Sequence, residues 1–268
     1  MIKCINTSTS KLLKKQILIF AVISNIMTKN KDWFESWFDT SYYHILYKHR
    51  DYSEGQSFLK NLITFLKLEK NKDILDLACG KGRHSIYLNS LGFNVMGADL
   101  SKNSIDYAKQ FETEALQFVE HDMRNPFKSK FDVILNLFTS FGFFEDDAED
   151  IAILQNIKNG LNPNGIAVID FMNTKKVISE LVAEEVLTID DITFKMNRYV
   201  KNGFIVKEIN FDADGKHHTY FEKVKSLDFD KINSYVNSVG FKIKHTFGDY
   251  QLEEFNKETS DRLILVLE

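Results

Sequence analysis

The spacing of apolar residues gives the first division of the chain. From residue 73 onward, short apolar runs alternate with longer segments in which apolar residues recur every three or four positions. The short runs have the length of strands, and the longer segments have the periodicity of amphipathic helices. We expect strands at 74–78, 94–98, 116–119, 131–137 and 166–171. Strands that alternate with helices in this way predict a doubly wound α/β sheet whose strands are mostly parallel.

The pattern changes near residue 185. Residues 185–227 are β-rich and contain two turn sequences, Lys201-Asn202-Gly203 and Asp212-Ala213-Asp214-Gly215. Asn-Gly and Asp-Gly pairs are typical of tight β-hairpins. The segment therefore predicts an antiparallel β-meander that is inserted into the α/β domain. A helix that ends at Gly240 and two further strands, at 241–247 and 262–267, then complete the sheet.

Two helical segments precede the first strand. Residues 32–50 are dense in aromatic side chains and predict one or two short helices. Residues 56–66 place their apolar side chains on one helical face, as an amphipathic helix does. Asn162-Pro163-Asn164-Gly165 has the composition of a turn, and we expect it to open the strand at 166–171.

Residues 1–26 form an extension of different texture. Three lysines precede the apolar run 17–23, which is too short to span a bilayer. The arrangement is like that of a signal peptide, but no small-residue cleavage site follows it. We expect Met27 to be the functional start, with residues 1–26 disordered or a mis-called start. The alternative is a frayed or membrane-peripheral tail, without stable membrane insertion.

The chain is thus expected to have five parts. They are the extension (1–26), an N-terminal helical cap (27–70), a ligand-binding sheet core (71–184), the meander as a lid (185–228) and the C-terminal part of the core (229–268).

Composition and charge narrow the possible functions. The 34 basic and 38 acidic residues give a net charge of −4, without a basic stripe. A protein that follows a phosphate backbone usually carries a basic excess, so nucleic acid is disfavoured as a partner. The cysteines, Cys4 and Cys79, cannot form a disulfide framework, and this fits a reducing cytoplasm. The sequence contains no metal-binding signature.

The loop after the first expected strand reads Asp76-Leu77-Ala78-Cys79-Gly80-Lys81-Gly82-Arg83-His84. Glycines at this place let the chain turn tightly and let a ligand approach the backbone. Asp99 ends the next strand about 20 residues later, where an acidic residue accepts ribose hydroxyls. The third glycine of a dinucleotide motif is replaced by Ser85, and a Walker-type phosphate loop is absent. Asp76 is poorly placed for a pyrophosphate, but it suits a ligand that carries an ammonium and a sulfonium group.

With these motifs the chain resembles the class I S-adenosylmethionine-dependent methyltransferases, in particular a small bacterial branch with a D-x-A/G-C-G-x-G-R-H-S loop. The resemblance covers residues 31–268 and implies a Rossmann-like seven-stranded sheet whose last strand is antiparallel. Further matching segments are His121-Asp122-Met123-Arg124, the stretch Asn136–Gly142 and the turn at 162–165.

The resemblance implies S-adenosyl-L-methionine as the cofactor and assigns roles to individual residues. Gly80 and Gly82 would pass under the methionine part, Asp99 would hold both ribose hydroxyls, and Asp122 would bond the adenine amino group beside the Met123 backbone. The full expected cofactor-binding set is Asp76, Ala78, Gly80, Gly82, Asp99, Leu100, Asp122, Met123 and Asn136. The segment that follows Asn136 would face the methyl group.

Two classes of methyl acceptor are disfavoured by the prolines. Methyltransferases that act on pyrimidines through a cysteine nucleophile carry a Pro-Cys pair, and those that act on exocyclic amines of bases or on glutamine amides carry a Pro-Pro pair. Neither Pro126 nor Pro163 precedes a cysteine or a second proline. Cys79 is expected to be a small packing residue rather than a nucleophile.

We therefore expect a methyltransferase that acts on a small molecule by in-line displacement. His44, Tyr43 and Asn136 are the candidate catalytic residues, although His44 and Tyr43 could equally be packing residues of the cap. A non-catalytic binder of S-adenosylmethionine, acting as a sensor or assembly protein, is the alternative. A nicotinamide-dependent enzyme is a weaker one, opposed by Ser85.

Overall fold

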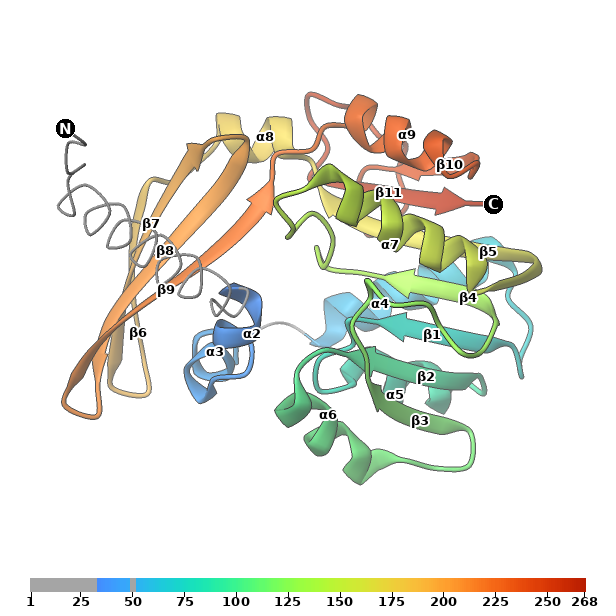
Figure 1. The fold of residues 1–268 in the computed structure, drawn as a ribbon, viewed down its shortest axis with the longest axis horizontal. Coiled ribbons are helices and arrows are strands. Elements are labelled where there is room, and N and C mark those ends of the chain that lie inside the picture. Colours follow the sequence, from blue (N-terminus) through green and yellow to red (C-terminus); the bar gives the residue numbers. More distant parts are fainter. Residues whose placement is uncertain (1–32, 49–51) are drawn as a thin grey trace, which may run out of the picture.

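The structure is a computed structural model that describes residues 33–48 and 52–268. The expectations for residues 1–26, including Met27 as the start, lie outside the described residues. A seven-stranded sheet forms the centre of the molecule, and a separate four-stranded sheet stands beside it (Figure 1).

The central sheet has the strand order β10-β11-β5-β4-β1-β2-β3. Strands β1 to β5 pair in parallel, whereas β11 runs antiparallel to β5, so the Rossmann-like prediction with a reversed last strand is confirmed. The strands are β1 Asp73–Leu77, β2 Asn94–Asp99, β3 Leu116–Glu120, β4 Phe131–Asn136, β5 Leu161–Met172, β10 Ile243–Phe247 and β11 Arg262–Leu267.

Helices cover both faces of this sheet and bury two apolar clusters against it. Helices α7 (Asp147–Asn159) and α9 (Phe229–Ser238) supply side chains such as Leu154 and Val236 to one cluster. Helices α4 (Tyr52–Leu66), α5 (Arg83–Ser90) and α6 (Lys102–Ala108) supply the other. The central strands read as continuous apolar runs because both of their faces are buried. Two short helices accompany these elements: η1 (Lys109–Phe111) directly follows α6, and α8 (Thr174–Ser179) follows β5.

The segment after β5 forms the predicted antiparallel meander. Its strands are β6 Glu184–Ile189, β7 Ile192–Lys201, β8 Phe204–Ala213 and β9 Lys216–Lys225, in that spatial order. Both turn residues of each hairpin have positive φ, which matches the type I′ geometry of two-residue hairpins. Two of these turns are the expected Asn202-Gly203 and Asp214-Gly215. The third, Asp190-Asp191, has no glycine and was not predicted.

Helices α2 (Trp33–Trp37) and α3 (Ser41–Leu46) pack against the meander. We call residues 33–48 the aromatic cap. Its Trp37 is fully buried in a cluster with Phe194, Met196 and Phe211 of the meander. The cap therefore lies between the meander and the sheet, as Figure 1 shows.

The segment Asn162–Gly165 differs from the expected turn. It lies inside β5, and the pairing of β4 with β5 shifts from Phe131–Leu161 to Val133–Ile166 across it. The segment thus bulges out of the ladder. Pro163 has no N–H to donate, so this position suits an interruption of the pairing.

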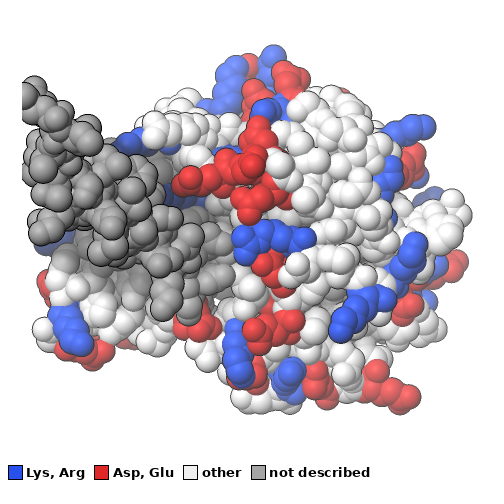
Figure 2. Space-filling view, viewed as in Figure 1, with Lys and Arg blue, Asp and Glu red and all other residues white. Residues whose placement is uncertain are grey.

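Charges are interspersed on the face that Figure 2 shows, where Lys and Arg alternate with Asp and Glu. Among residues 33–48 and 52–268, no helix is long and apolar enough to cross a membrane.

A buried ion pair joins the meander to the sheet layer. Lys225, the last residue of β9, places its ammonium 2.7 Å from Asp150 and 2.9 Å from Asp147, both in the first turn of α7. The Asp150 side chain is fully buried. Its burial raises its pKa to about 6, and the Lys225 ammonium opposes this rise. The pair fixes the position of β9, which supplies one wall of the cavity described below.

We predict that Asp150→Ala lowers the free energy of unfolding by about 2–3 kcal/mol, because the buried Lys225 ammonium loses its closest partner. Urea denaturation measures this change. The control is Asp212→Ala, which breaks the exposed Asp212–His217 pair and should shift stability by less than about 0.5 kcal/mol. Equal effects of the two variants would contradict the assignment.

Candidate active site

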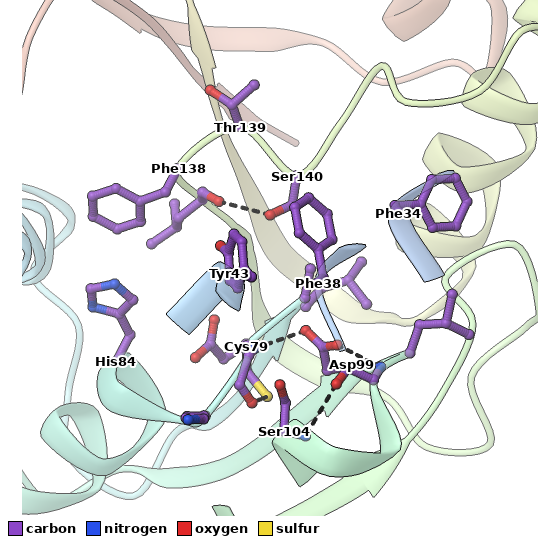
Figure 3. A pocket seen from close by; sticks show the side chains of 18 of the residues that line it. Phe34, Phe38, Tyr43, Cys79, His84, Asp99, Ser104, Phe138, Thr139 and Ser140 are labelled. Carbon is purple, nitrogen blue, oxygen red and sulfur yellow. Dashed lines mark hydrogen bonds between the residues drawn. The ribbon is translucent and has the colours of Figure 1, made fainter. Parts of the chain in front are cut away.

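A cavity of about 820 Å³ lies at the carboxyl ends of the parallel strands. This is the edge of an open α/β sheet at which ligands bind, and the volume is that of a small-molecule site. Most of its lining comes from three parts of the chain: the loops after β1 to β4, the aromatic cap, and β9 of the meander. Figure 3 shows Phe38 and Tyr43 of the cap reaching into the space that Asp99 and Ser140 border.

The glycine loop presents its backbone to this cavity at Gly80. A Cβ atom placed on Gly80 would meet nothing within 4 Å, and its φ of +56° favours glycine. Gly82 is different, because a Cβ there would lie 2.5 Å from the Phe118 ring. Gly80 lines the cavity together with Ala78, whereas Gly82 does not. The lack of a side chain at Gly82 thus permits close packing between α5 and β3, and the expectation that Gly82 passes under a ligand stays a prediction.

Asp99 occupies the predicted place at the end of β2. One carboxylate oxygen accepts from the Gly80 N–H and the other from the Ser101 N–H, both at 2.8 Å. Burial raises the pKa of Asp99, and these backbone hydrogen bonds oppose the rise. A carboxylate has about four lone-pair sites, so each oxygen keeps the capacity to accept from a ligand hydroxyl. Leu100, the next residue, also lines the cavity.

Asp76 supplies a second carboxylate to the cavity wall. It lies near the end of β1, is almost fully buried, and accepts a hydrogen bond of 2.6 Å from the Ser85 hydroxyl. Burial raises the pKa of Asp76 to about 6, and the Ser85 hydrogen bond opposes this rise. Above that pH the group is an anion in a protected site, which suits a cationic ligand atom.

Asp122 and Met123 line the cavity after β3, as predicted. Arg124 donates hydrogen bonds from Nε and Nη2 to Oδ2 of Asp122, at 2.9 and 2.7 Å. Although burial pushes the pKa of Asp122 upward, the Arg124 hydrogen bonds and charge hold it below its usual value. The Arg124 guanidinium also lies 5.0 Å above the Phe144 ring. Sequence reasoning gave Arg124 no role, although the i, i+2 spacing of the two charges was visible.

Asn136 does not line the cavity, in contrast to its expected part in catalysis and cofactor binding. Its side chain is 1% exposed, and its amide donates to the Leu77 carbonyl at 3.1 Å. It therefore ties the end of β4 to the end of β1. The wall that we expected from Asn136 is formed instead by the segment that follows it, Leu137–Ser140.

The cavity wall after β4 has a strained backbone that buried charges support. Phe138 and Thr139 have φ values of +58° and +65°, which β-branched and bulky residues rarely adopt. The fully buried Asp170 accepts from the Phe138 N–H at 2.8 Å and from Arg262 Nε at 2.8 Å. Arg262 also donates to the Thr139 hydroxyl at 3.0 Å. Sequence reasoning missed Asp170 and Arg262 because they lie 32 and 123 residues from the loop residues that they bind.

His44 and Tyr43 both line the cavity, from α3 of the aromatic cap. Burial and, to a smaller extent, the nearby Lys81 charge lower the pKa of His44 to about 4, and the Asp39 charge opposes this shift. The imidazole is therefore neutral at pH 7 with a free lone pair, and its low pKa makes it a weak base. The Tyr43 ring packs against Phe38 and Tyr47, with centroids 5.0 Å apart in each pair.

The cavity also borders the Cys79 thiol, which is buried. Burial raises the pKa of Cys79 well above its ordinary value, which makes the thiol a poor nucleophile. Within the described part of the chain, no three His, Cys, Asp or Glu side chains are grouped to hold a metal ion.

Known methyltransferases are similar to this chain in sequence. Residues 74–165 fit a family model described as a methyltransferase domain. The chain is 26% identical to a glycine/sarcosine N-methyltransferase of Aphanothece halophytica, over 81% of this chain and 82% of that protein. It is 27% identical to a glycine/sarcosine N-methyltransferase of Halorhodospira halochloris, over 74% and 75%.

A solved structure has the same fold. An S-adenosylmethionine-dependent methyltransferase from Clostridium acetobutylicum superposes with a TM-score of 0.71. The superposition covers 85% of this chain and 95% of that one, at 19% identity.

We predict that Asp170→Ala speeds amide hydrogen exchange in residues 137–142 by at least about tenfold, because the strained loop loses the acceptor that holds it. Exchange followed by mass spectrometry measures this. The matched control is Asp261→Ala. Asp261 is the exposed neighbour of Arg262 in sequence, and its side chain forms an ion pair with Lys176. If the amide exchange rate of residues 137–142 is the same in Asp170→Ala as in the wild type, contacts other than Asp170 hold this loop.

Proposed function

We propose that the chain is a class I S-adenosylmethionine-dependent methyltransferase that transfers a methyl group to a small-molecule acceptor, as its methyltransferase domain at residues 74–165 supports. The observation that carries the proposal is the cavity of about 820 Å³ between the sheet, the aromatic cap and the meander. Its volume is that of a pocket for a small molecule. The glycine/sarcosine N-methyltransferases act, by their names, on small amino acids, which agrees with such an acceptor.

We place S-adenosylmethionine in the half of the cavity that the β1, β2 and β3 loops line. Asp99 accepts the two ribose hydroxyls with the lone pairs that Gly80 and Ser101 leave open. The open backbone at Ala78 and Gly80 lies under the methionine part, and Leu100 flanks the nucleoside.

The two ends of the cofactor have further neighbours. Asp122 and Met123 border the adenine. Asp76 faces the cationic part of the cofactor, where its charge is stabilising above pH 6.

The acceptor occupies the other half, against the aromatic cap and the loop Phe138–Ser140. Bound S-adenosylmethionine supplies a methyl group on a sulfonium, which is already a good leaving group. The chain therefore has to orient the acceptor in line with this bond and exclude water. The rigid loop after β4 orients the acceptor, and the aromatic rings of the cap exclude water. The neutral His44 imidazole, with Tyr43 beside it, takes the proton of an acceptor that must lose one. Asn136 has no part in this proposal because it does not line the cavity.

The experiment is methyl transfer from methyl-labelled S-adenosylmethionine to a cell extract that has been separated by size. We expect label in the fraction below about 1 kDa, because the cavity admits only an acceptor of that size. Label in protein or nucleic acid would overturn the small-molecule proposal. Binding of the cofactor without any label transfer would favour the non-catalytic binder.

We predict that Asp99→Ala weakens S-adenosylhomocysteine binding by at least about tenfold, the equivalent of ~1.4 kcal/mol, because two charge-assisted hydrogen bonds to ribose are lost. Calorimetric titration measures the affinity. Asp99→Asn serves as a second variant that keeps the shape of the side chain. Asp106→Ala, an exposed carboxylate on α6, is the control and should bind as the wild type does. Unchanged affinity in both Asp99 variants would refute the ribose assignment.

We further predict that the affinity for S-adenosylmethionine falls as the pH drops through about 6. The pKa of Asp76 is raised to about 6 by burial, so below this pH the carboxyl is neutral and no longer attracts the cationic ligand. Titrations between pH 5 and pH 8 measure the slope, roughly up to tenfold in affinity per pH unit below the pKa. Asp76→Asn should flatten the profile. A profile of wild-type slope in Asp76→Asn would assign the titration to another group.

A further inference from the structure

The aromatic cap is joined to the meander by several polar contacts. The Trp37 indole and the Tyr47 hydroxyl donate to the Glu222 carboxylate at 2.8 and 2.7 Å. The Tyr42 hydroxyl donates to Asp214 at 2.5 Å. These contacts surround the apolar cluster that the cap shares with the meander. The cap and the meander therefore form one packed unit on the outer side of the cavity.

This unit is hydrogen-bonded to the loop after β2 through Asp39, in the turn between α2 and α3. One Asp39 oxygen accepts from the Ser101 hydroxyl at 2.7 Å and from the Asn103 N–H at 3.3 Å. The other accepts from the Asn103 side-chain amide at 2.9 Å. Ring packing, such as that of Trp33 on Phe143 with centroids 5.2 Å apart, accompanies these bonds. The Asp39 carboxylate is thus the polar link between the cap and this loop.

Ser101 connects the Asp39 contact to the proposed ribose site. Its N–H donates to Asp99, whose second oxygen accepts from Gly80. Its hydroxyl donates to Asp39 and accepts from the Ser104 N–H at 3.1 Å, which makes Ser101 the N-cap of α6. The residue that orients the Asp99 carboxylate is thus itself held by the cap. Asp39 does not line the cavity, so it acts on a ligand there through its neighbours and its charge rather than by direct contact.

From this geometry we infer that Asp39 is a positioning residue that holds the aromatic cap closed over the nucleoside half of the site and limits the release of S-adenosylhomocysteine. The inference rests on the proposed placement of the cofactor against Asp99. Release requires the cap to lift from the loop after β2, and lifting breaks the three hydrogen bonds to the Asp39 carboxylate. Lid opening that governs product release is a common determinant of turnover.

The test is the dissociation rate of S-adenosylhomocysteine, measured by stopped-flow displacement, with the affinity from calorimetry. We expect Asp39→Ala to raise the dissociation rate about tenfold and to change the association rate much less. Asn103→Ala removes the side-chain amide bonds to Asp39 and leaves the bonds from the Ser101 hydroxyl and the Asn103 N–H. Asn103 does not line the cavity, and its variant should raise the rate in the same direction by a smaller factor. The double variant should be only slightly faster than Asp39→Ala alone, because loss of the carboxylate leaves the Asn103 amide only its 3.4 Å bond to the Asp39 carbonyl.

The matched control is Tyr42→Phe. It removes the bond from the cap to Asp214 of the meander and leaves the Asp39 contact intact, so its dissociation rate should equal that of the wild type. Asp39→Asn, which keeps an acceptor for Ser101, should fall between the wild type and Asp39→Ala. If Asp39→Ala does not fold, Asn103→Ala and Asp39→Asn carry the test.

Three outcomes overturn the inference alone. They are rates within twofold of the wild type in the Asp39 and Asn103 variants, an equal acceleration in Tyr42→Phe, and additive effects in the double variant. A wild-type protein that binds neither S-adenosylmethionine nor S-adenosylhomocysteine would instead overturn the proposed function, and this inference with it.

Discussion

The two hydrogen bonds that the Asp99 carboxylate accepts from Gly80 and Ser101 connect the parts of the site. β1 and β2 are parallel neighbours, so the loops that follow them meet at the same edge of the sheet. Asp99 fixes these loops to each other and keeps lone pairs for a ligand. Through Ser101 the connection continues to Asp39 of the aromatic cap, and through Trp37 and Tyr47 to Glu222 of the meander. The cap is therefore hydrogen-bonded on one side to the loop after β2 and on the other to the meander, and it connects the walls of the cavity.

Buried charges hold the remaining walls in place. Asp170 and Arg262 support the left-handed backbone of Phe138 and Thr139, and Lys225 with Asp150 fixes the end of the meander. A buried ion pair contributes little net stability, but the loss of one partner is expensive. Strained backbone persists only where its surroundings enforce it, and it is concentrated at functional sites. Both ion pairs lie directly behind elements that line the cavity, which fits a role in positioning these elements rather than in overall stability.

The parts of the fold that depend on local pattern could be predicted from the sequence. The apolar runs gave the parallel strands, and Asn202-Gly203 and Asp214-Gly215 gave two of the hairpins, because these pairs adopt positive φ readily. The Asp190-Asp191 hairpin escaped prediction because aspartate there is a weaker turn signal than glycine. The bulge in β5 was not predicted, because the segment 162–165 contains both proline and glycine, and this composition is equally typical of a turn between two elements.

Within the site, the residues that line the cavity through their place at a strand end were predictable, as Asp76, Asp99 and Asp122 illustrate. The expected role of Asn136 stays a prediction: its amide donates to the Leu77 carbonyl, and the cavity wall begins one residue later. Arg262 and Asp39 were not predicted, because their partners lie 92 and 62 residues away along the chain. Contacts of that range depend on tertiary packing, which no local pattern encodes.

The central claim is that the sheet loops hold the cofactor, while the aromatic cap covers its nucleoside and, together with the meander, encloses the acceptor. A crystal structure of the complex with S-adenosylhomocysteine tests it most directly. The account predicts ribose hydroxyls within hydrogen-bond distance of both Asp99 oxygens. It also predicts the sulfur facing the half of the cavity that Tyr43, His44 and Thr139 border. A ribose bound away from Asp99, or a sulfur facing a wall with no space beyond it, would contradict the account.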